Sequence, residues 1–522
     1  MKALLDKVKH WLWDKDNIKL SLFIAAITLF FGLAFILSEF NSMPNDGLRD
    51  TLVMISYWLY VEIGVFGLLL VLCLNKWIFA ITFPLLMISC GVMTYFRYAA
   101  HAELTPSMID LLVVNDLRTD IHAISWLLVV VVLACIILSA VAVYYRFRKL
   151  HVRNWYVWLT VGLLMVYVVN NCIGTARVGE VQMRMPFSFY YNIKEYMNMH
   201  QTAQRMRPEF KGDVRCKSDS LTVVFIQGES LRADHLQING YHRATTPRLM
   251  SEENVVSLPH VISIHTLTHL SIPHILTRAD SLHQNRAYEE RSFISLLKQA
   301  GYRTYWLTNQ ESGPTYIYFM KECHQLKYAH PGSVTEKYDA WLDGDLLPLF
   351  DDALSQPAAR RFILLHTIGS HWFYNAHFNK QSELFTPLST NRVVRMNSEQ
   401  KLCNSYDNTI VYSDWFWQQL INRLRKQNAM IIYLSDHGES LGENGEYWHG
   451  KECKEQQSVA SFVWYSDEYA RRYPEKINAL KQNKNRHIKT DFLFHSILDA
   501  AGVESSYVEP LLDVFFAEQP LQ

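Results

Sequence analysis

The sequence predicts an α/β protein in which a five-helix transmembrane domain is followed by a soluble domain with a mostly parallel sheet between helices. Two observations support this prediction. Five apolar runs crowd the first third of the 522-residue chain, and strand-like apolar runs alternate with helical stretches from Leu221 onward. A membrane-spanning helix needs about 20 apolar residues, which matches the early runs. We therefore divide the chain into a transmembrane domain (1–173), a bridging segment with a linker (174–219) and a soluble domain (220–522).

The five apolar runs carry almost no charge. They are Leu20–Ser38, Leu52–Leu74, Trp77–Tyr95, Trp126–Tyr145 and Trp155–Cys172. Lysines and arginines gather before the first run, at Lys76 and between the fourth and fifth runs, whereas segments 39–51 and 96–125 hold few. Because basic residues mark the cytoplasmic side, we expect a cytoplasmic amino terminus and an external domain after Cys172. The balance of 50 basic and 50 acidic residues gives no electrostatic case for a nucleic-acid partner.

The bridging segment contains PFSFYYNIKEYMNMHQ (186–201), which is rich in aromatic residues and methionine. This composition is typical of a helix that lies in the headgroup region of a membrane. A helix packed on the soluble domain is an equally good interpretation. The polar stretch RPEFKGDVRCKSDS (207–220) then predicts a linker.

The soluble domain contains continuous apolar runs separated by helical stretches. The runs are LTVVFIQ (221–227), YRTYWLT (302–308), RFILLHTIG (361–369), AMIIYLS (429–435) and ASFVWYS (460–466). Continuous apolar strands that alternate with helices indicate a mostly parallel sheet covered on both faces. Ligands bind such sheets beyond the carboxyl ends of the strands. Functional residues are therefore expected immediately after these runs.

Two of these strand ends carry groups that bind metals. Glu229 follows the first run, and the pair Asp436–His437 follows the fourth. Carboxylate oxygens with an imidazole nitrogen form a ligand set that suits zinc, with an open position for substrate. A hydroxyl bound to zinc becomes an attacking alkoxide. The segment HVISIHTLTHLSIPHILTR (260–278) offers candidate nucleophiles, and periodicity does not choose among them: Thr266, Thr268, Ser271 and Thr277.

The tripeptide Gly-Glu-Ser occurs twice, at 228–230 and at 438–440. In the first copy the glutamate is the expected metal ligand, and Ser230 is expected to cap the following helix. In the second copy the metal ligands precede the glutamate. Glu439 is then either a group that orients His437 or, as we favour, an acid at the start of a helix.

Four segments together carry a resemblance to a known family. They are GESLRADHLQINGYHRATTPRL, LHTIGSHWFY, YDNTIVYSD and SDHGESLGENGEYWHG. In this order they resemble the membrane-anchored phosphoethanolamine transferases of Gram-negative bacteria, a family that includes lipid A modifying and mobile colistin-resistance enzymes. That family belongs to the alkaline phosphatase and sulfatase superfamily, and the resemblance covers the whole chain.

The resemblance implies an alkaline phosphatase/sulfatase-like fold for residues 220–522. It also implies a multi-pass protein of the bacterial inner membrane with its catalytic domain in the periplasm. The implied reaction moves phosphoethanolamine from phosphatidylethanolamine to lipopolysaccharide, at lipid A or core, or to a related glycan. Membrane lipids and this acceptor are the implied partners. The implied mechanism uses a zinc-activated threonine and a covalent phosphothreonine.

The family's functional residues match positions in this chain. The resemblance makes Thr268 the nucleophile and assigns the zinc ligands as Glu229, Thr268, Asp436 and His437. It implies substrate-binding roles for His371, His449, Asn309, Gln310, Asn115 and Thr119. The chain departs from the family at Ile264 and His274, where a disulfide is common, and at Pro314 and Ala123, where a lysine and a glutamate are common.

Two alternative functions differ in the group that is transferred. Phosphoglycerol transfer by an enzyme of the lipoteichoic acid synthase type would use the same architecture with another lipid headgroup. A sulfatase-like hydrolase is the weaker alternative, because its Cys/Ser-x-Pro-x-Arg motif has Ile275 in place of arginine. An oxidising compartment would permit disulfides among the cysteines of the soluble domain, Cys216, Cys323, Cys403 and Cys453, without fixing their pairing.

Overall fold

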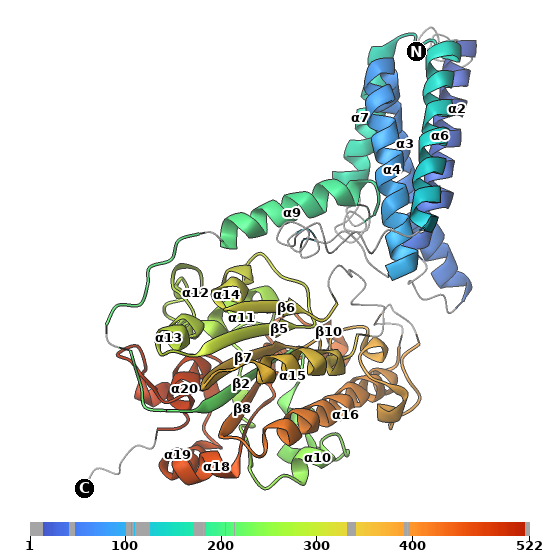
Figure 1. Cartoon of the computed structure of the whole chain (residues 1–522). Helices are drawn as coiled ribbons and strands as arrows, with labels where there is room; N and C mark the ends of the chain where they lie inside the picture. The colour runs from blue at the N-terminus through green and yellow to red at the C-terminus, as the bar shows by residue number, and fades with distance from the viewer. Residues whose placement is uncertain are drawn as a thin grey trace. The chain divides into compact units, whose positions relative to one another are not determined.

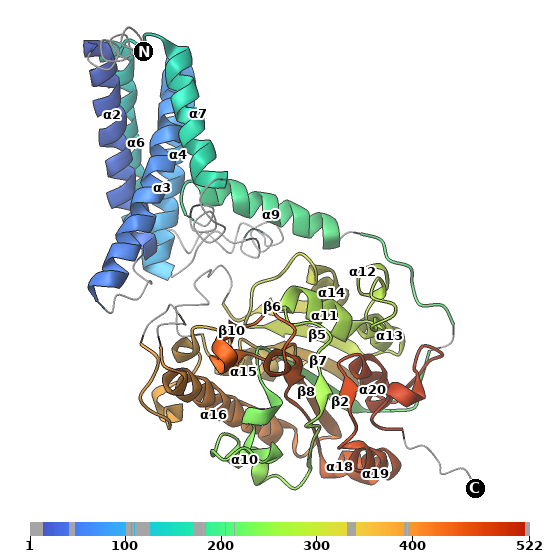
Figure 2. The ribbon, with the colours of Figure 1, turned by 180° about the vertical axis from the view of Figure 1, so that it is seen from behind.

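The computed structural model divides the chain into two compact units (Figures 1 and 2), one ending at Tyr196 and the other beginning at Met197. The structure describes residues 14–40, 47–100, 106, 109, 126–171, 181, 184–203, 205–212, 214–330, 341–390, 394 and 397–516. The three-part division at 173/174 and 219/220 remains a prediction.

The first unit is built from long apolar helices. They are α2 (Lys15–Phe31), α3 (Leu48–Leu74), α4 (Lys76–Ala100), α6 (Trp126–Lys149) and α7 (Trp155–Asn171). Within the described residues, four stretches are long and apolar enough to cross a membrane: Lys15–Phe40, Leu48–Leu74, Lys76–Tyr98 and Trp126–Lys149. These four spans anchor the protein in a membrane. The fifth predicted span corresponds to α7, whose 17 described residues are fewer than in the other four, so a count of five spans remains a prediction.

Small residues and one buried arginine hold these helices together. A side chain added at Gly67 of α3 would lie 2.9 Å from the carbonyl oxygen of Gly162 in α7, so glycine permits the close approach. Arg146 of α6 donates to the carbonyl oxygens of Cys73 and Leu74, at 2.7 and 3.0 Å. The arginine thereby satisfies carbonyl groups that are otherwise unpaired at the end of α3.

Helix α9 (Phe187–Ala203) confirms the helix expected in the bridging segment. It spans the division between the two units. Its location on a membrane surface remains a prediction.

The second unit contains a seven-stranded sheet. Its strand order is β3 (Val255–Ser257), β12 (Ser461–Tyr465), β8 (Ala429–Ser435), β2 (Leu221–Gly228), β7 (Arg360–His366), β5 (Arg303–Thr308) and β6 (Gln325–Tyr328). All five predicted apolar runs form strands of this sheet. The pairs from β8 to β6 are parallel, whereas β12 is antiparallel to both β8 and β3.

The sheet is therefore mixed, and β12 departs from the predicted parallel arrangement. Ser435 ends β8, and its N–H donates to the carbonyl oxygen of Ala460, immediately before β12. The chain therefore leaves the sheet at the carboxyl end of β8 and re-enters it at that same end, where β12 begins. A strand that starts at the carboxyl end of its neighbour must run antiparallel to it.

Helices cover both faces of the sheet (Figure 1). One buried core joins the sheet to α11 (Thr268–Leu276), α13 (Phe293–Gln299), α14 (Ile317–Glu322), α18 (Asp467–Arg472), α19 (Pro474–Asn483) and α20 (Phe492–Ala500). The core on the other face joins it to α10 (Pro247–Met250), α15 (Leu347–Ser355) and α16 (Glu399–Leu424).

Short elements complete the second unit. The two-stranded sheets pair β1 (Arg215–Cys216) with β14 (Val503–Glu504), and β9 (Ser440–Leu441) with β10 (Tyr447–Trp448). A three-stranded sheet contains β11 (Ser458–Val459), β4 (Val261–Ile262) and β13 (Ile488–Lys489), and the remaining helices are α12 (Arg286–Glu289) and α17 (Lys454–Gln457). The described cysteines of this unit are free thiols.

Candidate active site

Two adjacent strand ends bring the predicted metal ligands together. Strands β2 and β8 are parallel neighbours, and Gly228 pairs in register with Ser435. The next residues, Glu229 and Asp436, therefore leave the sheet side by side, and both side chains are buried. The backbone N–H of Asp436 also donates to the carbonyl oxygen of Gly228 at 3.2 Å, which fixes the two strand ends against each other.

Glu229, Asp436 and His437 form a compact cluster whose ligand atoms all lie within 4.8 Å of one another. His437 Nε2 is 3.4 Å from Glu229 Oε1 and 3.3 Å from Asp436 Oδ2. Thr268 Oγ1 lies 3.1 Å from His437 Nε2 and donates to Glu229 Oε2 at 3.3 Å. The structure thus brings the four predicted ligands together from three segments that lie far apart in the sequence.

The imidazole of His437 is oriented as a ligand. Its Nδ1 lies 2.9 Å from the carbonyl oxygen of Gly438, which only accepts, so Nδ1 carries the proton. Burial lowers the pKa of His437 to about 4, so the ring is neutral near pH 7. Its Nε2 lone pair consequently faces the carboxylates and Thr268, as metal-binding histidines require.

No cation in the described part of the chain bonds directly to the two carboxylates, although the positive charge of His449 interacts with both at longer range. Asp436 Oδ2 is buried and has no hydrogen-bond partner among the residues that the structure describes. Burial, followed by the nearby Asp436 charge, raises the pKa of Glu229 to about 7, and burial raises the pKa of Asp436 to about 6. A bound cation would offset this cost, since two buried carboxylates close together disfavour ionisation. Two carboxylates, one neutral imidazole and one hydroxyl fit zinc.

Thr268 is the first residue of α11, and its hydroxyl faces the cluster. Unpaired backbone N–H groups at a helix start favour a nearby anion such as phosphate. The rival hydroxyls of Ser271 and Thr277 instead donate to the carbonyl oxygens of His265 and Pro273, at 2.9 and 2.7 Å. These contacts favour Thr268 over Ser271 and Thr277.

A histidine pair holds the loop before α11 to the helix itself. His265 Nε2 lies 3.2 Å from His274 Nε2, and His274 Nδ1 lies 2.9 Å from the carbonyl oxygen of Leu270. Because that carbonyl fixes the proton of His274 on Nδ1, neutral His265 donates to His274. In the sequence, His265 and His274 lie on either side of Thr268. Their contact lies next to position 264 and at position 274, where the family commonly has a disulfide.

Ser230 is not the helix cap that the sequence predicted. Its backbone has φ +57°, a left-handed conformation that is uncommon outside glycine. Its hydroxyl donates to Glu229 Oε1 at 2.8 Å, and its N–H donates to Asp436 Oδ1 at 3.2 Å. The following 3₁₀ turn, 233–235, has no side-chain cap. The residue therefore orients both carboxylates instead of starting a helix.

Glu439 does not start a helix either, because β9 follows it directly. Its carboxylate is buried and accepts from Tyr374 Oη at 3.0 Å and from His449 Nδ1 at 2.8 Å. The ring of His449 lies 4.1 Å from that of His437, between centroids. Although burial acts against it, the Glu439 charge raises the pKa of His449 to about 9. Glu439 thus keeps a protonated histidine beside the cluster.

Gln310 contacts Glu229 of the cluster directly, whereas Asn309 bonds to Asp343 instead. Gln310 Nε2 lies 3.2 Å from Glu229 Oε2 and 2.6 Å from the carbonyl oxygen of Thr367. Asn309 is buried and donates to Asp343 Oδ1 at 3.2 Å. The predicted substrate-binding roles of both residues remain predictions. Asn115 and Thr119 lie outside the described residues.

The loop after β7 carries His371 and passes close behind Glu229. Gly369 has φ +52°, and a side chain there would lie 2.8 Å from the carbonyl oxygen of Glu229. Ser370 N–H donates to that same oxygen at 3.1 Å. The side chain of His371 is half-buried, with Nδ1 2.6 Å from the carbonyl oxygen of Trp372. Its predicted role at the substrate remains a prediction.

Sequence reasoning missed two residues that support the site. Asp343 is buried and accepts from the N–H groups of Ile368 and Gly369, at 2.8 and 3.1 Å. Ser263 Oγ lies 2.6 Å from the carbonyl oxygen of Asp436, and thereby links the nucleophile loop to β8. Asp343 lies in no segment that carried a metal-binding or catalytic pattern, and Ser263 lies in the 260–278 segment without being one of its candidate nucleophiles.

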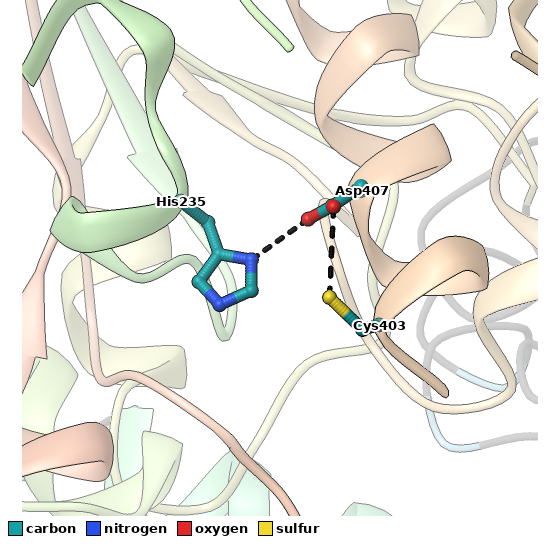
Figure 3. A group of neighbouring side chains, drawn as sticks. All are labelled: His235, Cys403 and Asp407. Atoms are coloured by element: carbon teal, nitrogen blue, oxygen red, sulfur yellow. Dashed lines mark hydrogen bonds and ion pairs between the residues drawn. The ribbon is translucent and has the colours of Figure 1, made fainter. Parts of the chain in front are cut away.

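A second histidine–carboxylate cluster, made of His235, Cys403 and Asp407, lies outside this site (Figure 3). Asp407 Oδ1 lies 2.7 Å from His235 Nδ1, and Cys403 Sγ lies 3.6 Å from Asp407 Oδ2. However, Arg243 Nη1 donates to Asp407 Oδ2 at 2.8 Å. The guanidinium already supplies the positive charge, so this cluster fits a structural network that joins the 235–243 loop to α16.

The family model for sulfatases matches residues 222–503, which is more than half of the chain. The chain therefore belongs to the sulfatase family.

Among curated relatives, the phosphoethanolamine transferase EptA of Escherichia coli (strain K12) is 31% identical over 316 residues, which are 57% of this chain and 56% of the relative. The chain thus matches about half the length of that relative. The resemblance to phosphoethanolamine transferases is confirmed.

Two solved structures share the fold. The integral membrane protein lipooligosaccharide phosphoethanolamine transferase A (EptA) from Neisseria meningitidis matches with a TM-score of 0.53 at 21% identity, over 94% of this chain and 98% of that chain. The C-terminal periplasmic domain of EcEptC from Escherichia coli, in complex with Zn, matches with a TM-score of 0.54 at 22% identity, over 61% of this chain and 92% of that chain.

Proposed function

We propose that this protein transfers phosphoethanolamine from phosphatidylethanolamine to lipopolysaccharide, at lipid A or core, or to a related glycan acceptor. The observation that carries the proposal is the position of Thr268 Oγ1, 3.1 Å from His437 Nε2 and 3.3 Å from Glu229 Oε2 at the start of α11. A hydroxyl held against a metal-type ligand set is arranged for nucleophilic attack on a phosphodiester. The similarity to EptA favours phosphoethanolamine as the group transferred.

Zinc is the metal that the site would hold, through Glu229, Thr268, Asp436 and His437. Bound zinc would lower the pKa of the coordinated hydroxyl and polarise a phosphoryl oxygen. The zinc in the EcEptC structure supports this choice. Ser230 and Gln310 would fix the Glu229 carboxylate, because each donates one hydrogen bond to it. The zinc content of this protein is a proposal.

The transfer would proceed in two balanced steps. Thr268 Oγ loses its proton to solvent and forms a bond to phosphorus, while the bond from phosphorus to the diacylglycerol oxygen breaks. The acceptor hydroxyl then gives its proton to His449, now neutral, and attacks the phosphothreonine, and the released Thr268 Oγ regains a proton from solvent. His449, held protonated by Glu439, is suited to donate the proton that the departing diacylglycerol oxygen needs. We propose that His371, Asn309, Gln310, Asn115 and Thr119 bind substrate.

We further propose that the anchor lies in the inner membrane and that residues 174–522 face the periplasm. The distribution of basic residues supports this orientation. Reporter fusions at the carboxyl terminus test it. A periplasmic phosphatase reporter should be active there, and an active cytoplasm-only reporter would overturn the orientation.

The nucleophile is tested with Thr268→Ala and its matched control Thr268→Ser. The alanine variant should fold and lose transfer by several orders of magnitude, as expected for a lost covalent nucleophile. The serine variant keeps the hydroxyl and should retain measurable transfer. Without acceptor, mass spectrometry should find phosphoethanolamine on the peptide containing residues 260–278. Normal activity of Thr268→Ala would refute the mechanism, and a phosphoglycerol adduct would identify another donor headgroup.

A further inference from the structure

The helical unit contains a groove of about 490 Å³ between α2, α4 and α6. Its walls are formed by Lys19, Leu22, Phe23, Ala26, Ile27, Phe30, Phe83, Met87, Leu138, Val141, Ala142 and Tyr145. On α2 and on α6 these residues recur at intervals of three and four, so each helix turns one continuous stripe toward the groove. Lys19 is the one cation among the wall residues.

The groove has the length of one membrane leaflet. From Lys19 to Phe30 its α2 wall extends eleven residues, which is about 16 Å of helix. The hydrocarbon core of a bilayer is about 30 Å thick, so half of it corresponds to one leaflet. Several wall side chains remain exposed, including Leu22 at 65% and Val141 at 61%. A single extended acyl chain fits this dimension.

The charge at one end selects the headgroup. Lys19 lies near the amino-terminal end of α2, which the distribution of basic residues assigns to the cytoplasmic side. Exposed Arg148 and Lys149 lie at the end of α6 that also bears the wall residue Tyr145. Basic positions beside a cleft between membrane helices favour an anionic lipid. Phe23 and Tyr145 stack at 5.3 Å between ring centroids, so this end has an aromatic wall.

We propose that the α2/α4/α6 groove binds an anionic phospholipid of the cytoplasmic leaflet, with one acyl chain along the helices and its phosphate at Lys19. The site is distinct from the donor site of the proposed reaction. The donor headgroup must reach Thr268 in the soluble unit, whereas the cation of this groove lies at the cytoplasmic end. The assignment of the leaflet rests on the proposed orientation, which the reporter fusions test separately.

Native mass spectrometry of the full-length chain tests the groove. Protein is extracted from vesicles of equal phosphatidylglycerol and phosphatidylethanolamine, and lipids that remain bound are identified. Wild-type protein should retain one phosphatidylglycerol. Lys19→Ala should lower its retention about fivefold, as expected for one basic residue near a lipid surface. Arg49→Ala, at an exposed cation of α3 that is outside the groove wall, should leave retention unchanged.

A bulky side chain tests the acyl-chain part. Ala26→Trp should fill the groove and abolish lipid retention, whereas Ala25→Trp, at an exposed neighbour outside the groove wall, should not. If Ala26→Trp does not fold, Ala26→Leu provides a milder block with a smaller expected loss. Equal lipid retention by the groove-blocking and control variants would overturn the site. Equal retention of the two phospholipids would overturn the choice of an anionic headgroup. Loss of phosphoethanolamine transfer in Ala26→Trp alone would identify the groove as a donor site instead.

Discussion

Two buried histidine–carboxylate clusters of the soluble unit differ in the source of their positive charge. Asp407 accepts from Arg243 at 2.8 Å and contacts His235 at 2.7 Å, so the protein itself neutralises it. Asp436 lies beside Glu229, and its Oδ2 has no hydrogen-bond partner in the described chain. A buried carboxylate oxygen that no group bonds directly is costly. A directly bonded arginine therefore completes the Asp407 cluster as a structural network, whereas the open oxygen of Asp436 indicates a place for a metal.

The largest expected effect is on metal content and activity. Asp436→Asn removes an anionic ligand and should lower zinc content and transfer strongly, by at least about tenfold to a hundredfold even if metal affinity alone is affected. Asp407→Asn is the matched control in the other cluster and should leave zinc stoichiometry unchanged. Elemental analysis with a transfer assay measures both. Full zinc occupancy in Asp436→Asn would place the metal elsewhere.

Removal of the metal should change the thermal stability of the protein through the Glu229–Asp436–His437 cluster and not through the His235–Cys403–Asp407 cluster. Chelation should lower the melting temperature of the wild-type protein, since a ligand present at a thousandfold excess over its Kd contributes about 4 kcal/mol. In the chelated state Asp436→Asn should be more stable than wild type, because it removes one of two close buried carboxylates. Calorimetry with and without chelator measures this reversal. A chelated variant that melts below wild type would contradict the repulsion inferred at the site.

Removing the internal cation should destabilise the second cluster. Arg243→Met leaves Asp407 without its guanidinium and should cost about 3 kcal/mol in the free energy of unfolding, because an uncompensated charge stays buried. The double variant Arg243→Met/Asp407→Asn should recover part of that loss. Denaturant unfolding measures all three proteins at saturating zinc. A double variant less stable than Arg243→Met would show that charge compensation is not the reason for the loss.

Another buried carboxylate, Glu322, gives the smallest expected effect. Glu322 accepts from the hydroxyl and from the N–H of Ser292, the latter at 3.2 Å. Burial raises its pKa from 4.5 to about 7. Between these values the folded protein keeps a proton that the unfolded chain has released, so the free energy of unfolding falls as the pH rises.

Glu322→Gln should reduce that decline by about 2 kcal/mol between pH 4.5 and 7. The difference between variant and wild type, followed by unfolding with chelator throughout, isolates this residue from the metal ligands. Parallel pH profiles would mean that Glu322 titrates alike in the folded and unfolded states.

The sequence predicted the strands well because continuous apolar runs identify buried strands locally. It placed β2 and β8 and so identified Glu229 and the Asp436–His437 pair at their ends. It misassigned Ser230 and Glu439, because a serine or glutamate after a strand looks the same whether it caps a helix or holds another side chain. The partners that decide the matter, Asp436 for Ser230 and His449 for Glu439, depend on tertiary structure.

Taken by itself, the sequence determined the apolar membrane helices, the alternation of strands and helices, and the kinds of residue in the candidate metal cluster. These features follow from hydrophobic length, period and side-chain chemistry, which are local properties. Only the tertiary structure decided that Thr268 meets His437 at 3.1 Å, that β12 is antiparallel, and that Arg243 neutralises Asp407. Each of these joins segments distant in the chain, and local patterns do not encode which distant segments pack together.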